Sequence, residues 1–183
     1  MINNEESTRI VKDLMNQNLI KKSVECSDRF FLKKSLQSIN VANRLFKLQY
    51  EEKIDTNLWV INASYYEIFF AATALLAKHN KRIHTDLGIH KLTYNAFINY
   101  FINEKKLIEK YYYEAYKEAI EEAEQLMQFS ETKTQELTSD YINELTKRKR
   151  FTYNLGEEAE RTKAETSLKR SKNFVRIIET LII

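Results

Sequence analysis

The sequence contains no proline and only two glycines, Gly88 and Gly156, among its 183 residues. Proline and glycine supply most of the tight turns that connect β-strands, so this chain has few means of forming hairpins. Apolar residues make up 43% of the sequence and aromatic residues 12%, which is enough for a buried core. The sequence therefore predicts an all-α protein, an up-and-down helical bundle that forms one domain over residues 1–183, with no strand.

The segment 56–79 is apolar and aromatic on nearly every side of a helix. A helix that is apolar all round is buried all round, so we expect this helix at the centre of the bundle. Asn62, Ser64, Glu67 and several tyrosines interrupt the segment, which argues against a membrane span. The residues Asn62 and Ser64 also need hydrogen-bond partners if they are buried.

Amphipathic helices are expected on both sides of the central one. Their predicted ranges are 5–22, 27–52, 89–103, 108–130, 135–151 and 157–182. Apolar residues spaced three and four apart define their inner faces. For the second helix these are Leu32, Leu36, Ile39, Asn43, Phe46 and Tyr50, and for the last they are Ala164, Leu168, Ser171, Val175, Ile178 and Ile182. We expect the last helix to pack antiparallel against the core, Ser27 and Asp28 to cap the second helix, and residues 78–85 to form a loop.

A single cysteine, Cys26, excludes an intrachain disulfide and a cysteine-based zinc site. The first residues show no basic stretch followed by an apolar one, so they do not resemble a signal peptide. Both features predict a cytoplasmic protein. The net charge of +3 is too small to imply nucleic-acid binding unless the cations cluster.

Three segments, taken in order, resemble the HEPN superfamily, in particular its small stand-alone prokaryotic members. The first is NASYYEIFFAATALL at 62–76, which is similar to the family's helix with paired tyrosines followed by small and apolar residues. The second is His90 followed by Phe97 and Phe101. The third is the basic segment KRKRFTY at 147–153, followed by an acidic turn and a final helix. Relative to this family, residues 1–26 form an N-terminal helical extension, and 108–134 form an insertion that contains an extra or elongated helix.

The ribonuclease members of that family carry an arginine, a polar residue and, a few residues later, a histidine. Here Lys149 follows Arg148, Tyr153 and Asn154 stand where the histidine would fall, and no histidine lies beyond His90. Asn154 cannot transfer a proton, and the usual pKa of a tyrosine, about 10, makes Tyr153 a poor base near neutrality. The resemblance therefore implies a HEPN-like RNA- or nucleotide-binding protein that lacks the usual catalytic histidine. The alternative is a metal-independent endoribonuclease with an altered site that uses Arg148, Tyr153 and Asn154.

The predicted phosphate-binding residues are Arg148 and Arg150 with Lys147, because a guanidinium matches the geometry of phosphate oxygens. A run of cations at a helix end also has a simpler explanation, since it interacts favourably with the helix dipole. From the central helix, Asn62, Ser64 and Tyr66 are expected to face the same cleft. Two further basic clusters are Lys169, Arg170, Lys172 and Arg176, and Lys78, Lys81 and Arg82.

The resemblance also implies a homodimer with a cleft between the subunits, a toxin–antitoxin or defence role, and a nucleotidyltransferase as a possible protein partner. No metal and no cofactor are expected, because His84 and His90 lack carboxylates at suitable spacing. A non-enzymatic adaptor is the other alternative, in which the tyrosine-rich helix at 108–130 binds a protein partner.

Overall fold

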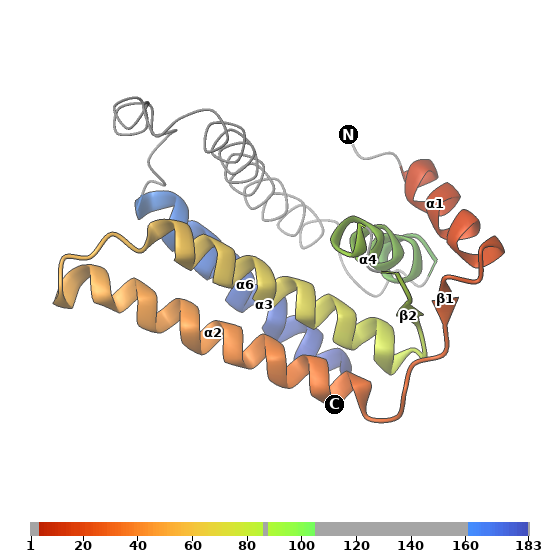
Figure 1. Cartoon of the computed structure of the whole chain (residues 1–183), viewed down its shortest axis with the longest axis horizontal. Coiled ribbons are helices and arrows are strands. Elements are labelled where there is room, and N and C mark those ends of the chain that lie inside the picture. Colours follow the sequence, from red (N-terminus) through yellow and green to blue (C-terminus); the bar gives the residue numbers. More distant parts are fainter. Residues whose placement is uncertain (1–3, 86–87, 105–160, 183) are drawn as a thin grey trace, which may run out of the picture.

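The computed structural model describes residues 4–85, 88–104 and 161–182, and over these ranges the chain is an all-α helical bundle, as predicted (Figure 1). The elements are helices α1 (Asn4–Asn16), α2 (Ser27–Glu51), α3 (Asn57–Lys78), α4 (Ile89–Phe97) and α6 (Arg161–Ile182), a π-helix η1 (Ile98–Glu104), and strands β1 (Ile20–Lys21) and β2 (Arg82–Ile83). The predicted helices at 108–130 and 135–151 lie outside the described residues, and so does the start of the one predicted at 157–182.

Helices α2, α3 and α6 lie side by side along their length and form the main body (Figure 1). The helices α2 and α3 are antiparallel. Helix α6 begins beside the end of α2, where the Arg161 guanidinium lies 4.1 Å from the centre of the Tyr50 ring, so it is antiparallel to α2. It runs parallel to α3, with Glu67 level with Ser171. The expected antiparallel packing of the last helix therefore holds against α2 only.

The central position predicted for residues 56–79 is confirmed, because twelve residues of α3 are buried between α2, α4 and α6. Within the described ranges, α3 is the one helix long and apolar enough to cross a membrane, and 67% of its apolar window is buried inside the protein. The inner face predicted for α6 is also confirmed. All six of its residues, Ala164, Leu168, Ser171, Val175, Ile178 and Ile182, are buried.

The inner face predicted for α2 is partly wrong. The buried residues of this helix are Ser35 and Ala42, whereas the predicted Leu36 and Tyr50 are exposed. The buried positions of α2 thus carry small side chains, and its larger apolar residues are half-buried or exposed. The prediction missed this because it assigned the largest apolar residues to the interface.

The predicted caps also differ from the observed ones. Cys26 precedes α2 with a left-handed backbone (φ 61°), and Ser27 is already its first residue. At the start of α3, the side chain of Asp55 accepts a 3.0 Å hydrogen bond from the N–H of Asn57. The hydroxyl of Thr56 donates to the carbonyl of Leu45 at 2.7 Å and links the α2–α3 connection to α2.

The helix predicted at 5–22 ends earlier, at Asn16, and the chain continues into β1. This strand pairs with β2 within the segment 78–85 that was predicted to be a loop. Helix α1 is held by buried polar contacts, since Ser7 donates to Oδ1 of Asn95 and Thr8 to Oδ1 of Asn99, both at 2.9 Å. With Val11 and Leu14 in the main core, the N-terminal segment packs as part of the bundle.

Helix α4 continues directly into η1, and together they cover the predicted range 89–103. Phe97 and Phe101 are fully buried, and the ring centres of Phe97 and Phe174 of α6 are 5.4 Å apart. This end of the molecule therefore shares one continuous core with α3 and α6.

Candidate functional site

The predicted site residues of α3 lie on two different sides of the helix. Asn62 and Tyr66, one turn apart, line an open groove, whereas Ser64 is fully buried. Residues two positions apart point in nearly opposite directions on a helix, so Ser64 cannot share a surface with the other two. Lys147, Arg148, Arg150, Tyr153 and Asn154 lie outside the described residues.

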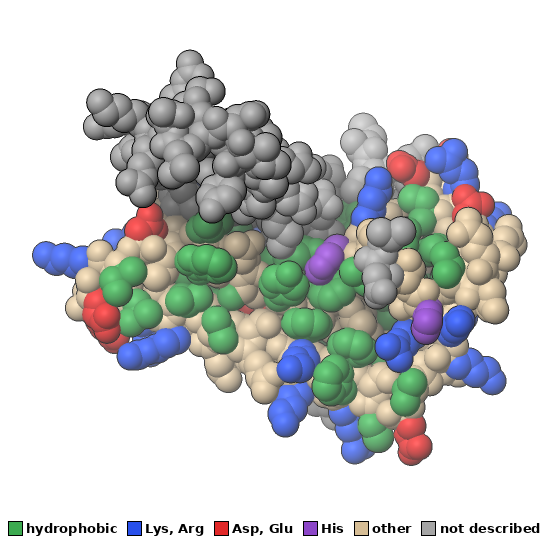
Figure 2. Space-filling model, in the orientation of Figure 1, with side chains coloured by type: hydrophobic (Ala, Val, Ile, Leu, Met, Phe, Trp, Pro, Cys, Tyr) green, Lys and Arg blue, Asp and Glu red, His purple; other side chains and the backbone are tan. Residues whose placement is uncertain are grey.

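An apolar hollow, the α2–α3 groove, lies between these two helices. It has a volume of about 410 Å³, and its surface is almost wholly apolar. Trp59 is 62% exposed and Val41 is 52% exposed, which is unusual for side chains of this kind. In Figure 2, hydrophobic side chains gather over α2 and α3 on the face in view. The residues that line the groove are Lys34, Gln37, Ser38, Val41, Leu45, Trp59, Asn62, Ala63, Tyr66 and Phe70.

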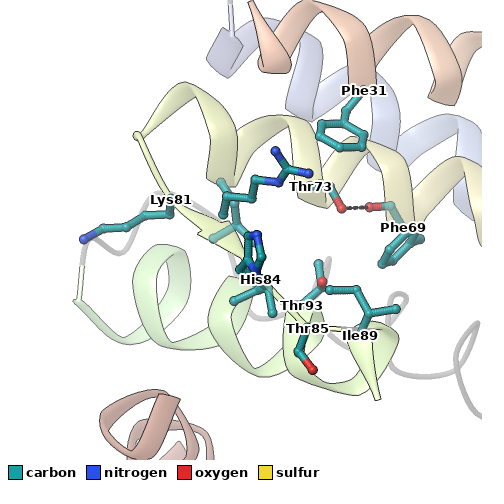
Figure 3. A pocket seen from close by; sticks show the side chains of 11 residues that line it. Phe31, Phe69, Thr73, Lys81, His84, Thr85, Ile89 and Thr93 are labelled. Atoms are coloured by element: carbon teal, nitrogen blue, oxygen red, sulfur yellow. Dashed lines mark hydrogen bonds between the residues drawn. The ribbon is translucent and has the colours of Figure 1, made fainter. Parts of the chain in front are cut away.

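The second hollow, the basic cavity, lies between the second half of α3, β2 and the start of α4, with a volume of about 260 Å³ (Figure 3). Its apolar wall consists of Phe31, Phe69, Leu76, Ile83 and Ile89, and its polar residues are Thr73, Lys81, Arg82, His84, Thr85 and Thr93. The N-terminus of α4, which follows Gly88, lies at one side and adds the positive end of a helix dipole.

The third basic cluster predicted from the sequence only partly converges on this cavity. Lys78 is exposed at the end of α3 and does not line it. Figure 3 shows Lys81 directed away from the other labelled residues. Its ammonium lies 5.1 Å from the centre of the Tyr100 ring, a cation–π contact. Arg82 and His84 are therefore the basic side chains that this arrangement leaves for a ligand.

A buried polar seam separates α3 from α6. Ser64, Glu67, Ser167 and Ser171 are at most 1% exposed. Neither carboxyl oxygen of Glu67, nor the hydroxyls of Ser64 and Ser167, has a hydrogen-bond partner among the described residues. The Ser171 hydroxyl donates to the carbonyl of Leu168 at 3.1 Å. Burial raises the pKa of Glu67 to about 8, against the opposing effects of the Ser171 hydroxyl and the Lys172 charge. The carboxyl group is therefore largely protonated at neutral pH.

His90 packs against aromatic side chains of α3. Its ring centre is 4.3 Å from that of Phe69 and 5.4 Å from that of Tyr65. Burial lowers the pKa of His90, so the imidazole is held neutral. Its buried Nδ1 has no partner among the described residues. His90 therefore packs as part of the aromatic side of α3.

Over residues 4–85, 88–104 and 161–182 the chain is a helical bundle. It carries an apolar groove between α2 and α3, and a basic cavity between the second half of α3, β2 and the start of α4. No group of three or more histidine, cysteine or acidic side chains suited to a metal ion occurs within those ranges. No protein-family model matches the chain, and no curated protein or solved structure is significantly similar to it.

Sequence reasoning missed the groove and half of the cavity. The groove had a signal, since a helix that is apolar on every side keeps one apolar face in solvent unless neighbours surround it completely. No sequence signal pointed to His84, because only the β1–β2 pairing brings this residue beside the wall formed by Phe31 and Phe69. The N–H of His84 donates to the carbonyl of Leu19 at 2.8 Å, a contact across 65 residues of sequence.

Proposed function

We propose that this chain is a HEPN-like, cytoplasmic, homodimeric protein that binds RNA or a nucleotide, and that it belongs to a toxin–antitoxin or defence system. The observation that carries the binding proposal is the basic cavity. Arg82 supplies positive charge, and the His84 imidazole and the hydroxyls of Thr85 and Thr93 supply hydrogen-bonding groups, beside a wall of apolar and aromatic side chains. The guanidinium and the hydrogen-bonding groups suit a phosphate, and the apolar wall accommodates a base.

The sequence supports this proposal independently through Lys147, Arg148 and Arg150, and helix α6 adds further cations. This helix carries Lys169, Arg170, Lys172 and Arg176 in its middle turns, with no acidic residue among them. A chain with these clusters attracts a polyanion even though its net charge is only +3. The proposal does not assign catalysis, because the usual histidine after Arg148 is missing.

Binding of AMP and of a single-stranded RNA oligonucleotide to the full-length protein tests this function. We expect both to bind, with RNA affinity that falls steeply with salt concentration. The variant Arg82→Gln should weaken AMP binding, and Arg148→Gln combined with Arg150→Gln should weaken RNA binding. Arg9→Gln, on the exposed side of α1, is the matched control. Absence of binding of either ligand at low salt would refute the proposal.

A further inference from the structure

We propose that the α2–α3 groove is the docking site for an amphipathic helix with an acidic polar face, supplied by a different protein. This inference concerns a surface other than the basic cavity and does not depend on nucleotide binding. It follows from the shape of the groove, from its apolar lining and from the charges on the two helices that form it.

The groove has the length and the lining that a helix needs. Along α3 it extends from Trp59 to Phe70, which is about 16 Å at the rise of an α-helix. This span accepts roughly three turns of a partner helix, whose apolar residues at i, i+3, i+4 and i+7 would contact Trp59, Val41 and Phe70. Trp59 is 62% exposed, so burying its indole provides the aromatic anchor typical of protein interfaces.

The charge around the groove selects the partner. Helix α2 carries five exposed cations, Arg29, Lys33, Lys34, Arg44 and Lys47, and its acidic residues, Asp28 and Glu51, lie only at its two ends. In α3 the sole acidic residue is Glu67, whose carboxyl is buried and faces α6. The Arg44–Glu51 ion pair, at 3.5 Å, offsets one of the five cations. The exposed surface of α2 is therefore positive, and Lys34 brings this charge to the groove itself, so an acidic helix complements it.

The same charges disfavour two other occupants. A second copy bound through a two-fold axis would place the cations of one α2 against those of the other, and like charges facing one another oppose association. RNA would meet only one cation, Lys34, within an almost wholly apolar lining, so its phosphates would lose water without gaining partners. The proposed homodimer is thus expected to form through another face.

A selection experiment tests the proposal. A display library of three- to four-turn helical peptides, each with an apolar stripe and with polar positions drawn from Glu, Gln and Lys, is selected against the full-length protein. The emission of Trp59, which is the only tryptophan in the chain, then reports binding of each selected peptide made without tryptophan. We expect the enriched peptides to carry an excess of Glu and to shift the Trp59 emission to shorter wavelength.

Two variants locate the site and test the charge rule. Val41→Glu should weaken binding at least about tenfold, which corresponds to about 1.4 kcal/mol. Val24→Glu, the same change at an exposed valine outside the groove, should not weaken binding. Lys33→Glu combined with Lys34→Glu should move the selection toward Lys-rich peptides. Enrichment of basic or uncharged peptides, displacement of the peptide by single-stranded RNA, or conversion of an oligomer into monomers by Val41→Glu would each overturn the proposal.

Discussion

The hydroxyl of Ser35 donates a 2.8 Å hydrogen bond to the backbone carbonyl of Glu67, whereas the carboxyl of the same glutamate has no hydrogen-bond partner among the described residues. The central helix is thus bonded to α2 through its backbone and presents a buried carboxyl group to α6. Burying a polar group without a partner costs free energy. Removing a bonded group and removing an unbonded one near this contact should therefore change the stability in opposite directions.

The contribution of Glu67 to the stability of the protein should fall as pH rises between about 4.5 and 8. In the unfolded chain the Glu67 carboxyl ionises at its ordinary pKa of 4.5, whereas in the folded protein burial raises that pKa to about 8. The unfolded state therefore binds fewer protons in this window, and the free energy of unfolding decreases by roughly 1.4 kcal/mol per pH unit. Urea denaturation at several pH values measures this slope.

The variant Glu67→Gln should flatten that dependence and leave other titrations unchanged. Its stability relative to the wild type should rise with pH across the same window. Glu165→Gln, which removes an exposed carboxyl from α6, serves as the control. If the wild type and Glu67→Gln show the same slope, Glu67 is ionised in the folded protein and its burial does not have the stated effect.

Two serines of the bundle should respond in opposite ways to replacement by alanine. Ser35→Ala loses a buried hydrogen bond and should destabilise the protein by about 1 kcal/mol. Ser64→Ala removes a fully buried hydroxyl that has no hydrogen-bond partner among the described residues, and should be neutral or stabilise the protein by up to about 1 kcal/mol. Chemical denaturation of both variants provides the comparison, and equal destabilisation would contradict the difference in bonding.

Phe97 connects α4 to the rest of the core. Phe97→Ala should cost about 3–5 kcal/mol, because it removes a fully buried ring that packs against Phe101 and Phe174. Phe30→Ala, at a ring that is 56% exposed on α2, should cost far less. Thermal unfolding followed by circular dichroism measures both, and similar losses would show that the two rings are equally accessible in solution.

The contact between Ser7 and Asn95 should be measurable as a coupling between α1 and α4. Asn95→Ala leaves the buried Ser7 hydroxyl without its acceptor and should cost about 1–3 kcal/mol. Adding Ser7→Ala to Asn95→Ala should cost less than Ser7→Ala costs alone, since the pair is then removed together. Hydrogen exchange of the α1 amides reports the same loosening, and strict additivity would show that the two side chains do not interact.

The helices were predictable where periodicity was strong, and their contacts were not. The burial of α3 and the inner face of α6 follow from residue type alone, because apolar positions at helical spacing define a face. The burial of Ser35 and Ala42 in α2 could not be predicted from hydrophobicity, because neither side chain is strongly apolar. The placement of Ser64 opposite Tyr66 follows from helix geometry. The exposure of Trp59 depends on which sides of α3 remain uncovered, which only the packed bundle determines.

The parallel placement of α3 and α6 has a consequence for the order of events during synthesis. Glu67 and Ser171 face one another although about 100 residues separate them, so the apolar side of α3 is translated long before the helix that covers it. At roughly 5–20 residues per second, this delay lasts on the order of 5–20 s. During that interval the side of α3 that α6 will cover stays exposed, which makes the nascent chain a substrate for chaperones and exposes it to aggregation until α6 has left the ribosome.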